Sequence, residues 1–152
     1  MTWNAIRRFI LLPPADRALV VRVGLLVGFV RVLLWTCSWC RVRRAMRMLP
    51  ARLSSRFQPA SIDRLVWAVL QASRVIPHAT CLTQSLALQC ALNAIDVDSS
   101  VVIGVRKDPG GVFLSHAWVE KDGRMFLDTS SDASRYIPMV ILGPDLNPIS
   151  AS

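Results

Sequence analysis

The stretch Thr80-Cys81-Leu82-Thr83-Gln84-Ser85-Leu86-Ala87-Leu88 begins an apolar helix pattern with a cysteine in its first turn. Further on, Ser115-His116-Ala117-Trp118-Val119-Glu120 alternates as a strand does, and Phe126-Leu127-Asp128 follows a tight turn. We expect the cysteine helix to run to about Asn93, with Thr80 as its cap. The sequence therefore predicts a thiol, an imidazole and a carboxylate, carried in that order by a helix and two strands.

The composition fits one domain with a strongly basic first third. A chain of 152 residues can bury about two-thirds of its unfolded surface, enough for a real core. Residues 1–60 hold eleven arginines and one acidic residue, whereas the rest of the chain has a slight negative charge. Such a block attracts an acidic peptide, an anionic membrane surface or nucleic acid, or it is simply a solvated helix face. Nucleic acid is disfavoured because no aromatic residues interleave with the arginines on a sheet.

The segment 18–40 is the most hydrophobic part of the chain. A helix start is expected at Pro13-Pro14. Arg22 and Arg31 interrupt the apolar run, which argues against a membrane span, since a span needs about twenty consecutive apolar residues. We therefore expect a packed helical region, with a helix on the membrane surface and a true span as the alternatives. A break near Gly24 or Gly28 would instead give two shorter helices.

The remaining segments predict helices followed by strands. Pro50 should close the basic end of the first region, and 51–60 should form a connection. Ser61 should cap a second helix that ends before Pro77. Strands are expected at 101–105, 112–120 and 124–128, whereas the tail from Tyr136 gives no clear pattern. The order indicates an α+β fold, with a helical region over 1–58 and, over 59–152, a core of helices packed on an antiparallel sheet. The thiol, imidazole and carboxylate, in that chain order, resemble the layout of a papain-like or transglutaminase-like core.

The hairpin after His116 sets the predicted geometry of the site. If Lys121-Asp122-Gly123 forms a three-residue loop, His116 faces Asp128, Glu120 faces Arg124 and Trp118 faces Phe126. If Asp122-Gly123 forms a two-residue turn, His116 faces Thr129 instead. We favour the three-residue loop because it gives three favourable pairs at once.

The three residue types suit acyl transfer. The first turn of a helix favours a thiolate at Cys81, and its backbone amides can stabilise an oxyanion. His116 would act as general base and acid, and Asp128 would hold its tautomer. Gln84 is a weaker candidate for a second oxyanion donor. The alternatives are a core cysteine and a half-buried structural histidine.

These motifs resemble the lasso-peptide B protein family of maturation proteases. The resemblance rests on Cys81 to Leu88, Val102 to Lys107, and His116 to Glu120 with Gly123 and Asp128, and covers about residues 60–138. It implies a transglutaminase-like core, with the catalytic cysteine, histidine and aspartate at Cys81, His116 and Asp128. Thr83 departs from the residue that many relatives have, but leaves the three catalytic positions untouched.

The resemblance also implies partners. They would be a precursor peptide, a separate leader-binding protein and an asparagine-synthetase-like cyclase, which would use ATP itself. No strands like those of a leader-binding domain are expected in residues 1–60, so the chain resembles the stand-alone form. The favoured hypothesis is a leader peptidase. The alternatives are a non-catalytic scaffold whose basic helices bind a partner or an anionic membrane, and an acyl transferase in which an amine replaces water.

Other candidate sites are weaker. Cys37 and Cys40 have the spacing of a metal or redox pair, but no second ligand pair follows at a suitable distance. The loop Asp108-Pro109-Gly110-Gly111 joins strands and does not open a helix, which disfavours a phosphate site. We expect no cofactor or metal bound by this chain. Met1 to Arg8 does not resemble a cleavable signal peptide, so a cytoplasmic protein with reduced thiols is expected, with membrane association as the alternative.

Overall fold

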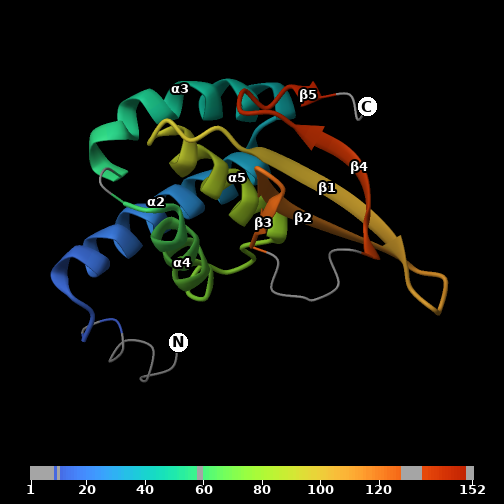
Figure 1. Ribbon diagram of the computed structural model, residues 1–152, viewed down its shortest axis with the longest axis horizontal. Helices are drawn as coiled ribbons and strands as arrows, with labels where there is room; N and C mark the ends of the chain where they lie inside the picture. Colours follow the sequence, from blue (N-terminus) through green and yellow to red (C-terminus); the bar gives the residue numbers. More distant parts are fainter. Residues whose placement is uncertain (1–8, 10, 58–59, 128–134, 150–152) are drawn as a thin grey trace.

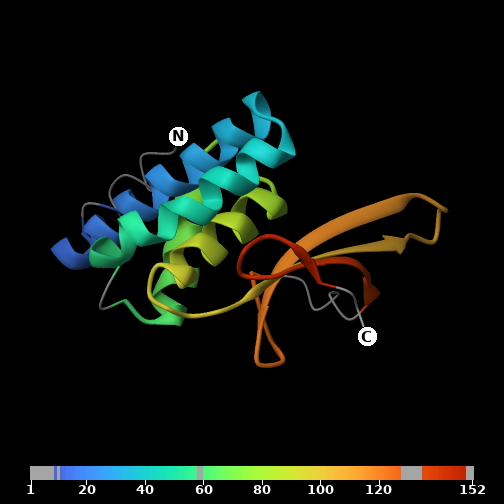
Figure 2. The same cartoon turned by 90° about the horizontal axis from the view of Figure 1, so that it is seen from above.

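The computed structural model describes residues 9, 11–57, 60–127 and 135–149, and it has the α+β fold that the sequence predicted. Helices form one layer and an antiparallel sheet forms the other (Figures 1 and 2). The helices are α2 (Pro14–Thr36), α3 (Trp39–Phe57), α4 (Ile62–Ser73) and α5 (Cys81–Asn93). The strands are β1 (Ser100–Lys107), β2 (Phe113–Lys121), β3 (Arg124–Phe126), β4 (Ile137–Leu142) and β5 (Pro148–Ile149). Their order across the sheet is β3-β2-β1-β4-β5.

The hydrophobic segment forms one unbroken helix, α2, that starts at Pro14 as expected. Gly24 does not break it. A Cβ at that position would lie 3.7 Å from the Cβ of Ala72, so the glycine lies where α2 passes close to α4. The chain turns at Cys37-Ser38 instead, and α3 then runs back alongside α2 (Figure 2). The helical hairpin thus exists, but its break lies thirteen residues after Gly24.

The prediction that the basic helical segment ends at Pro50 is wrong. Helix α3 continues through Pro50 to Phe57, so most of the predicted connection is helical. Proline removes one helical hydrogen bond, which usually ends or kinks a helix. Here the buried side chains of Val42, Met46 and Phe57 hold α3 against the core on both sides of the proline. Tertiary packing has therefore overridden a local helix-breaking residue.

The helix of the cysteine stretch lies at the centre of the core. Nine of its residues are buried, including Ser85, Leu88 and Leu92. It contacts α2, α3 and α4 on one side and β1 and β2 on the other. The predicted caps are confirmed: the Oγ of Ser61 accepts a hydrogen bond from the amide of Arg64, and the Oγ1 of Thr80 accepts one from Thr83.

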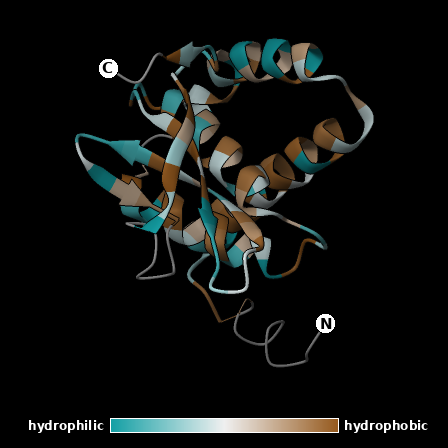
Figure 3. Cartoon of the chain, turned by 90° about the vertical axis from the view of Figure 1, so that its right-hand side faces the viewer, coloured by the Kyte–Doolittle hydropathy of each residue, from teal (hydrophilic) through white to brown (hydrophobic). Residues whose placement is uncertain are grey.

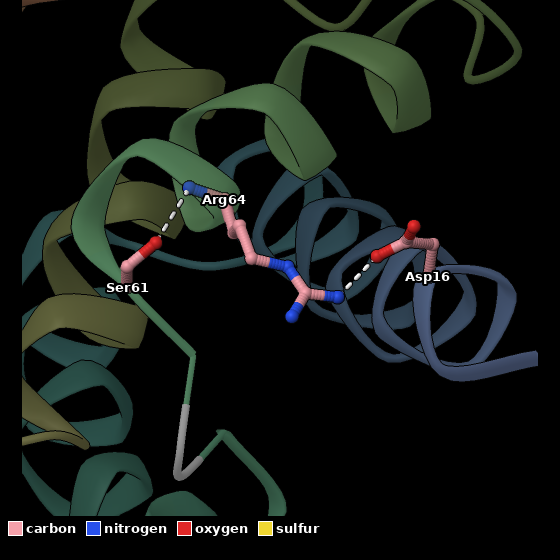
Figure 4. Close-up of polar contacts among 3 residues, drawn as sticks. All are labelled: Asp16, Ser61 and Arg64. Carbon is pink, nitrogen blue, oxygen red and sulfur yellow. Dashed lines mark hydrogen bonds and ion pairs between the residues drawn. The ribbon is translucent and has the colours of Figure 1, made fainter. Parts of the chain in front are cut away.

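An ion pair ties the first turn of α2 to the first turn of α4. The guanidinium of Arg64 pairs with the carboxylate of Asp16, while Ser61 caps the same end of α4 (Figure 4). Acidic charge near a helix N-terminus also complements the helix dipole, as Asp16 does on α2. The contact aligns the two helices whose apolar faces meet in the core.

One hydrophobic cluster contains buried residues from both sides of the predicted boundary at residue 58. Val23 and Val27 of α2 pack in it with Leu65 of α4 and Val119 of β2. The division into a helical region over 1–58 and a core over 59–152 stays a prediction.

The register predicted for the hairpin between β2 and β3 is wrong. Lys121 pairs with Arg124 and Val119 pairs with Phe126, so Asp122 and Gly123 form a two-residue turn. Both turn residues have positive φ, 49° and 75°, which is the geometry of a type I′ turn. This turn matches the twist of the two strands, whereas the expected three-residue loop was favoured for its side-chain pairs alone. The predicted pairs of Glu120 with Arg124 and of Trp118 with Phe126 are absent from the ladder.

Candidate active site

The thiol of Cys81 lies on the first residue of α5 and is half-buried. Thr80 caps the helix, and its Oγ1 also lies 3.0 Å from the Oγ1 of Thr83. The backbone amides of the first turn carry the positive end of the helix dipole, where a thiolate or an oxyanion is stabilised. The local setting of Cys81 is therefore the one that the sequence predicted.

The imidazole of His116 lies near the middle of β2, in a cluster of aromatic side chains. Its ring stacks on Trp118, with centroids 6.0 Å apart and planes inclined by 24°. On another side it meets Tyr136, at 5.5 Å between centroids. His116 is half-buried and Trp118 is almost fully buried, at 1% exposure. These contacts restrict the rotation of the imidazole, as a positioned base requires.

The cluster continues outward from the histidine. The Nε1 of Trp118 donates a 2.8 Å hydrogen bond to the Oε1 of Glu120, which fixes the indole plane. The guanidinium of Arg106 lies over the ring of Tyr136, 5.2 Å from its centroid. Sequence reasoning identified Trp118 as a neighbour of His116 but missed Tyr136, because the tail gave no strand pattern. An aromatic residue just before β4 was the available signal.

Gly104 provides room for this cluster. It pairs with His116 across β1 and β2, so a side chain there would point to the same side of the sheet. A Cβ on Gly104 would come within 3.0 Å of the Cβ of Tyr136 and even closer to the indole of Trp118. The glycine thus permits both aromatic side chains to approach the strand.

Helix α5 packs against β2, so the elements that carry Cys81 and His116 are direct neighbours (Figure 1). Alternation along β2 places His116 with Trp118 and Glu120, on the opposite side of the strand from Val119, which packs on the helices. A contact between the thiol of Cys81 and the imidazole of His116 stays a prediction.

The third predicted residue, Asp128, lies outside the described residues. The ladder between β2 and β3 ends at Phe126, and Leu127 has a φ of 65°, which turns the backbone out of the strand. The pairing of His116 with Asp128 therefore stays a prediction, although the three-residue loop on which it was based is not formed. The catalytic role of Asp128 likewise stays a prediction.

The remaining candidates have structural explanations. The Nε2 of Gln84 donates to the carbonyl of Ala79, 3.0 Å away, so this amide is already engaged at the start of α5. Cys37 and Cys40 are free thiols; Cys37 is half-buried and Cys40 is exposed. Burial raises the pKa of the Cys90 thiol to about 12, which keeps it neutral and unreactive. Within the described ranges, no three His, Cys, Asp or Glu side chains are grouped to hold a metal ion.

A capped cysteine at the start of a central helix, packed against an antiparallel strand that carries a histidine, defines the class of papain-like and transglutaminase-like folds. The family model of the transglutaminase-like superfamily matches residues 24–141. The chain belongs to this superfamily. The matched range includes Cys81, His116 and Asp128, and it also includes most of the helical region.

One characterised relative is the Microcin J25-processing protein McjB of Escherichia coli. It is 30% identical over 125 residues, which cover 77% of this chain and 58% of the relative. The chain thus spans less than two-thirds of that protein's length. No solved structure shows significant similarity. The family model and the relative bear out the resemblance to the lasso-peptide B proteins that the sequence motifs indicated.

Proposed function

We propose that this chain is a cysteine peptidase that removes the leader from a ribosomally made lasso-peptide precursor. The observation that carries the proposal is the position of Cys81, at the capped first turn of a helix packed on the strand of His116. Membership of the transglutaminase-like superfamily and similarity to a microcin-processing protein support the same chemistry. The chain would act with a leader-binding protein and deliver its product to a cyclase.

The reaction would proceed through an acyl enzyme. His116 takes the proton of the Cys81 thiol, and the sulfur attacks the carbonyl carbon of the scissile peptide bond. The amide of Cys81 stabilises the oxyanion, the carbon–nitrogen bond breaks, and the imidazolium gives its proton to the leaving amine. Water, deprotonated by His116, then hydrolyses the thioester. In this proposal Asp128 orients the imidazole.

The test is cleavage of the precursor peptide in the presence of the leader-binding protein. Cys81→Ala should keep the fold and lower the cleavage rate by at least about 1000-fold, as loss of a nucleophile does. Cys40→Ala, which removes an exposed thiol, is the matched control and should cleave normally. Cleavage by Cys81→Ala at the wild-type rate would refute the assignment.

The mass of the product separates the peptidase from an acyl transferase. Hydrolysis leaves a free carboxylate on the leader, whereas acyl transfer leaves an amide to the accepting amine. The scaffold alternative predicts that Cys81→Ala has no effect, and that charge reversal at arginines of α3 abolishes function instead.

A further inference from the structure

Helix α2 exposes a stripe of large apolar side chains that the proposed peptidase chemistry does not use. We call it the α2 stripe. Its members and exposed fractions are Val21 at 50%, Leu25 at 72%, Phe29 at 43%, Val32 at 55% and Trp35 at 81%. They follow one another at intervals of three or four residues, so they lie on one face of the helix.

The opposite face of α2 is buried in the protein. Leu19, Val23, Leu26 and Val30 on that side are at most 6% exposed and pack mainly on α4 and α5. By length and mean hydropathy, α2 could cross a bilayer, and it is the one such helix in the part of the chain that the structure describes. Spanning a bilayer would remove the buried face of α2 from its contacts with the core. The α2 stripe can therefore contact an apolar phase only while α2 stays packed on the surface of the protein.

Arginines border the α2 stripe. At 100° per residue, Arg22 and Arg31 lie on opposite sides of it. The Nη1 of Arg22 donates a 2.7 Å hydrogen bond to the carbonyl of Arg56, which holds the end of α3 beside α2. Helix α3 in turn exposes five arginines along its length, and Figure 3 shows its hydrophilic residues beside the mostly hydrophobic α2. They are Arg41, Arg44, Arg47, Arg52 and Arg56.

Acidic residues are almost absent from the first sixty positions of the sequence. Asp16 is the single acid in residues 1–60, and it pairs with Arg64. The α2 stripe and its border therefore combine exposed apolar area with an excess of positive charge, although Arg47 interacts electrostatically with Asp145. A second copy of the chain would bring two arginine surfaces together, which like-charge repulsion disfavours.

We propose that the α2 stripe docks on an anionic lipid bilayer, with α2 lying in the plane of the interface. The apolar side chains enter the boundary between headgroups and acyl chains, and the arginines of α3 contact lipid phosphates. Trp35, the most exposed member, and Trp39 at the start of α3 suit the interface, where tryptophan is favoured. Docking leaves the core packed and needs no change of fold.

Cosedimentation of the full chain with vesicles tests the proposal. The protein should sediment with vesicles of phosphatidylcholine and phosphatidylglycerol, and far less with phosphatidylcholine alone. The variant Leu25→Ser/Trp35→Ser should lower the partition coefficient by about tenfold or more, because it removes the two most exposed side chains of the α2 stripe. Arg44→Glu/Arg52→Glu should abolish the preference for anionic vesicles and its sensitivity to salt.

The matched control is Val112→Ser/Phe113→Ser, which removes two apolar side chains, 58% and 73% exposed, at the far hairpin between β1 and β2. It should bind vesicles as the wild type does. Circular dichroism establishes that each variant is folded. Three results would overturn the proposal. The first is wild-type protein that stays in solution with anionic vesicles, and the second is α2 variants that bind vesicles as the wild type does. The third is a dimer or a complex with an acidic protein, seen by light scattering, that the α2 substitutions disrupt while the chain binds no lipid.

Discussion

Gly104 lies directly against the indole of Trp118: a Cβ on the glycine would stand 2.8 Å from Cη2 and 3.0 Å from Cζ3. Real Cβ atoms do not approach so closely, so any side chain at position 104 must displace the tryptophan. The tryptophan stacks on His116 and donates to Glu120. A methyl group on one strand would therefore disturb the proposed catalytic base on the next.

Gly104→Ala is expected to lower both stability and activity. Overpacking a buried site costs about 1–3 kcal/mol, which urea unfolding would measure, and a shifted imidazole should also reduce the cleavage rate. Gly28→Ala is the control: nothing lies within 4 Å of its added Cβ, and the change within α2 should stabilise by about 0.5–1 kcal/mol. Equal stability of wild type and Gly104→Ala, with an unchanged near-ultraviolet dichroism spectrum, would contradict this packing.

Gln89 should prove important for joining α5 to the sheet. Its buried Nε2 lies 2.9 Å from the carbonyls of Ser99 and Gly143, and 3.4 Å from that of Leu142. Gln89→Leu keeps the side-chain volume but leaves buried carbonyls without this donor, so the free energy of unfolding should fall by about 1–3 kcal/mol. Gln71→Leu, on α4, serves as a control because its Oε1 accepts only from Arg74. A stable Gln89→Leu protein would show that water satisfies these carbonyls instead.

The four thiols should differ in reactivity. Cys90 is 2% exposed and its pKa is raised to about 12, so iodoacetamide should leave it unmodified at pH 8 in the folded protein, whereas the exposed Cys40 should react. Peptide mass mapping reads out each site.

The same thiol makes stability depend on pH. The unfolded chain releases the Cys90 proton above about pH 9.0, while the folded chain keeps it until about pH 12. The contribution of the neutral thiol to stability is thus complete below pH 9.0 and is lost as the pH rises toward 12. Cys90→Ala should flatten this alkaline loss in urea titrations, and an unchanged slope would refute the assignment to Cys90.

The two-residue turn at Asp122-Gly123 offers a test of the observed register. Gly123 has a φ of 75°, and its added Cβ would meet nothing, so Gly123→Ala should destabilise through the backbone alone, by about 1 kcal/mol. Asp122→Gly should be tolerated, since glycine adopts the φ of 49° readily. Neutral thermal unfolding of Gly123→Ala would contradict the left-handed conformation of this turn residue.

Local signals determined much of the fold. Thr80 and Ser61 predicted two helix starts correctly, because a cap acts through hydrogen bonds three residues away. The alternation in β1 and β2 predicted their positions within a residue or two. It also placed Trp118 beside His116, since residues two apart in a strand share a face. The position of Cys81 in the first turn of a capped helix was predicted from the same local signals.

Contacts between distant residues decided the rest. The passage of α3 through Pro50 depends on the core that Met46 and Phe57 reach, and no local signal reveals that core. The register after Lys121 was chosen by turn geometry over side-chain pairing. Tyr136 meets His116 only because β4 pairs with β1, some 35 residues earlier in the chain. The sequence by itself determined which groups could perform the chemistry, since residue type and local pattern are written in it, whereas the neighbours of each group depend on packing that only the folded chain establishes.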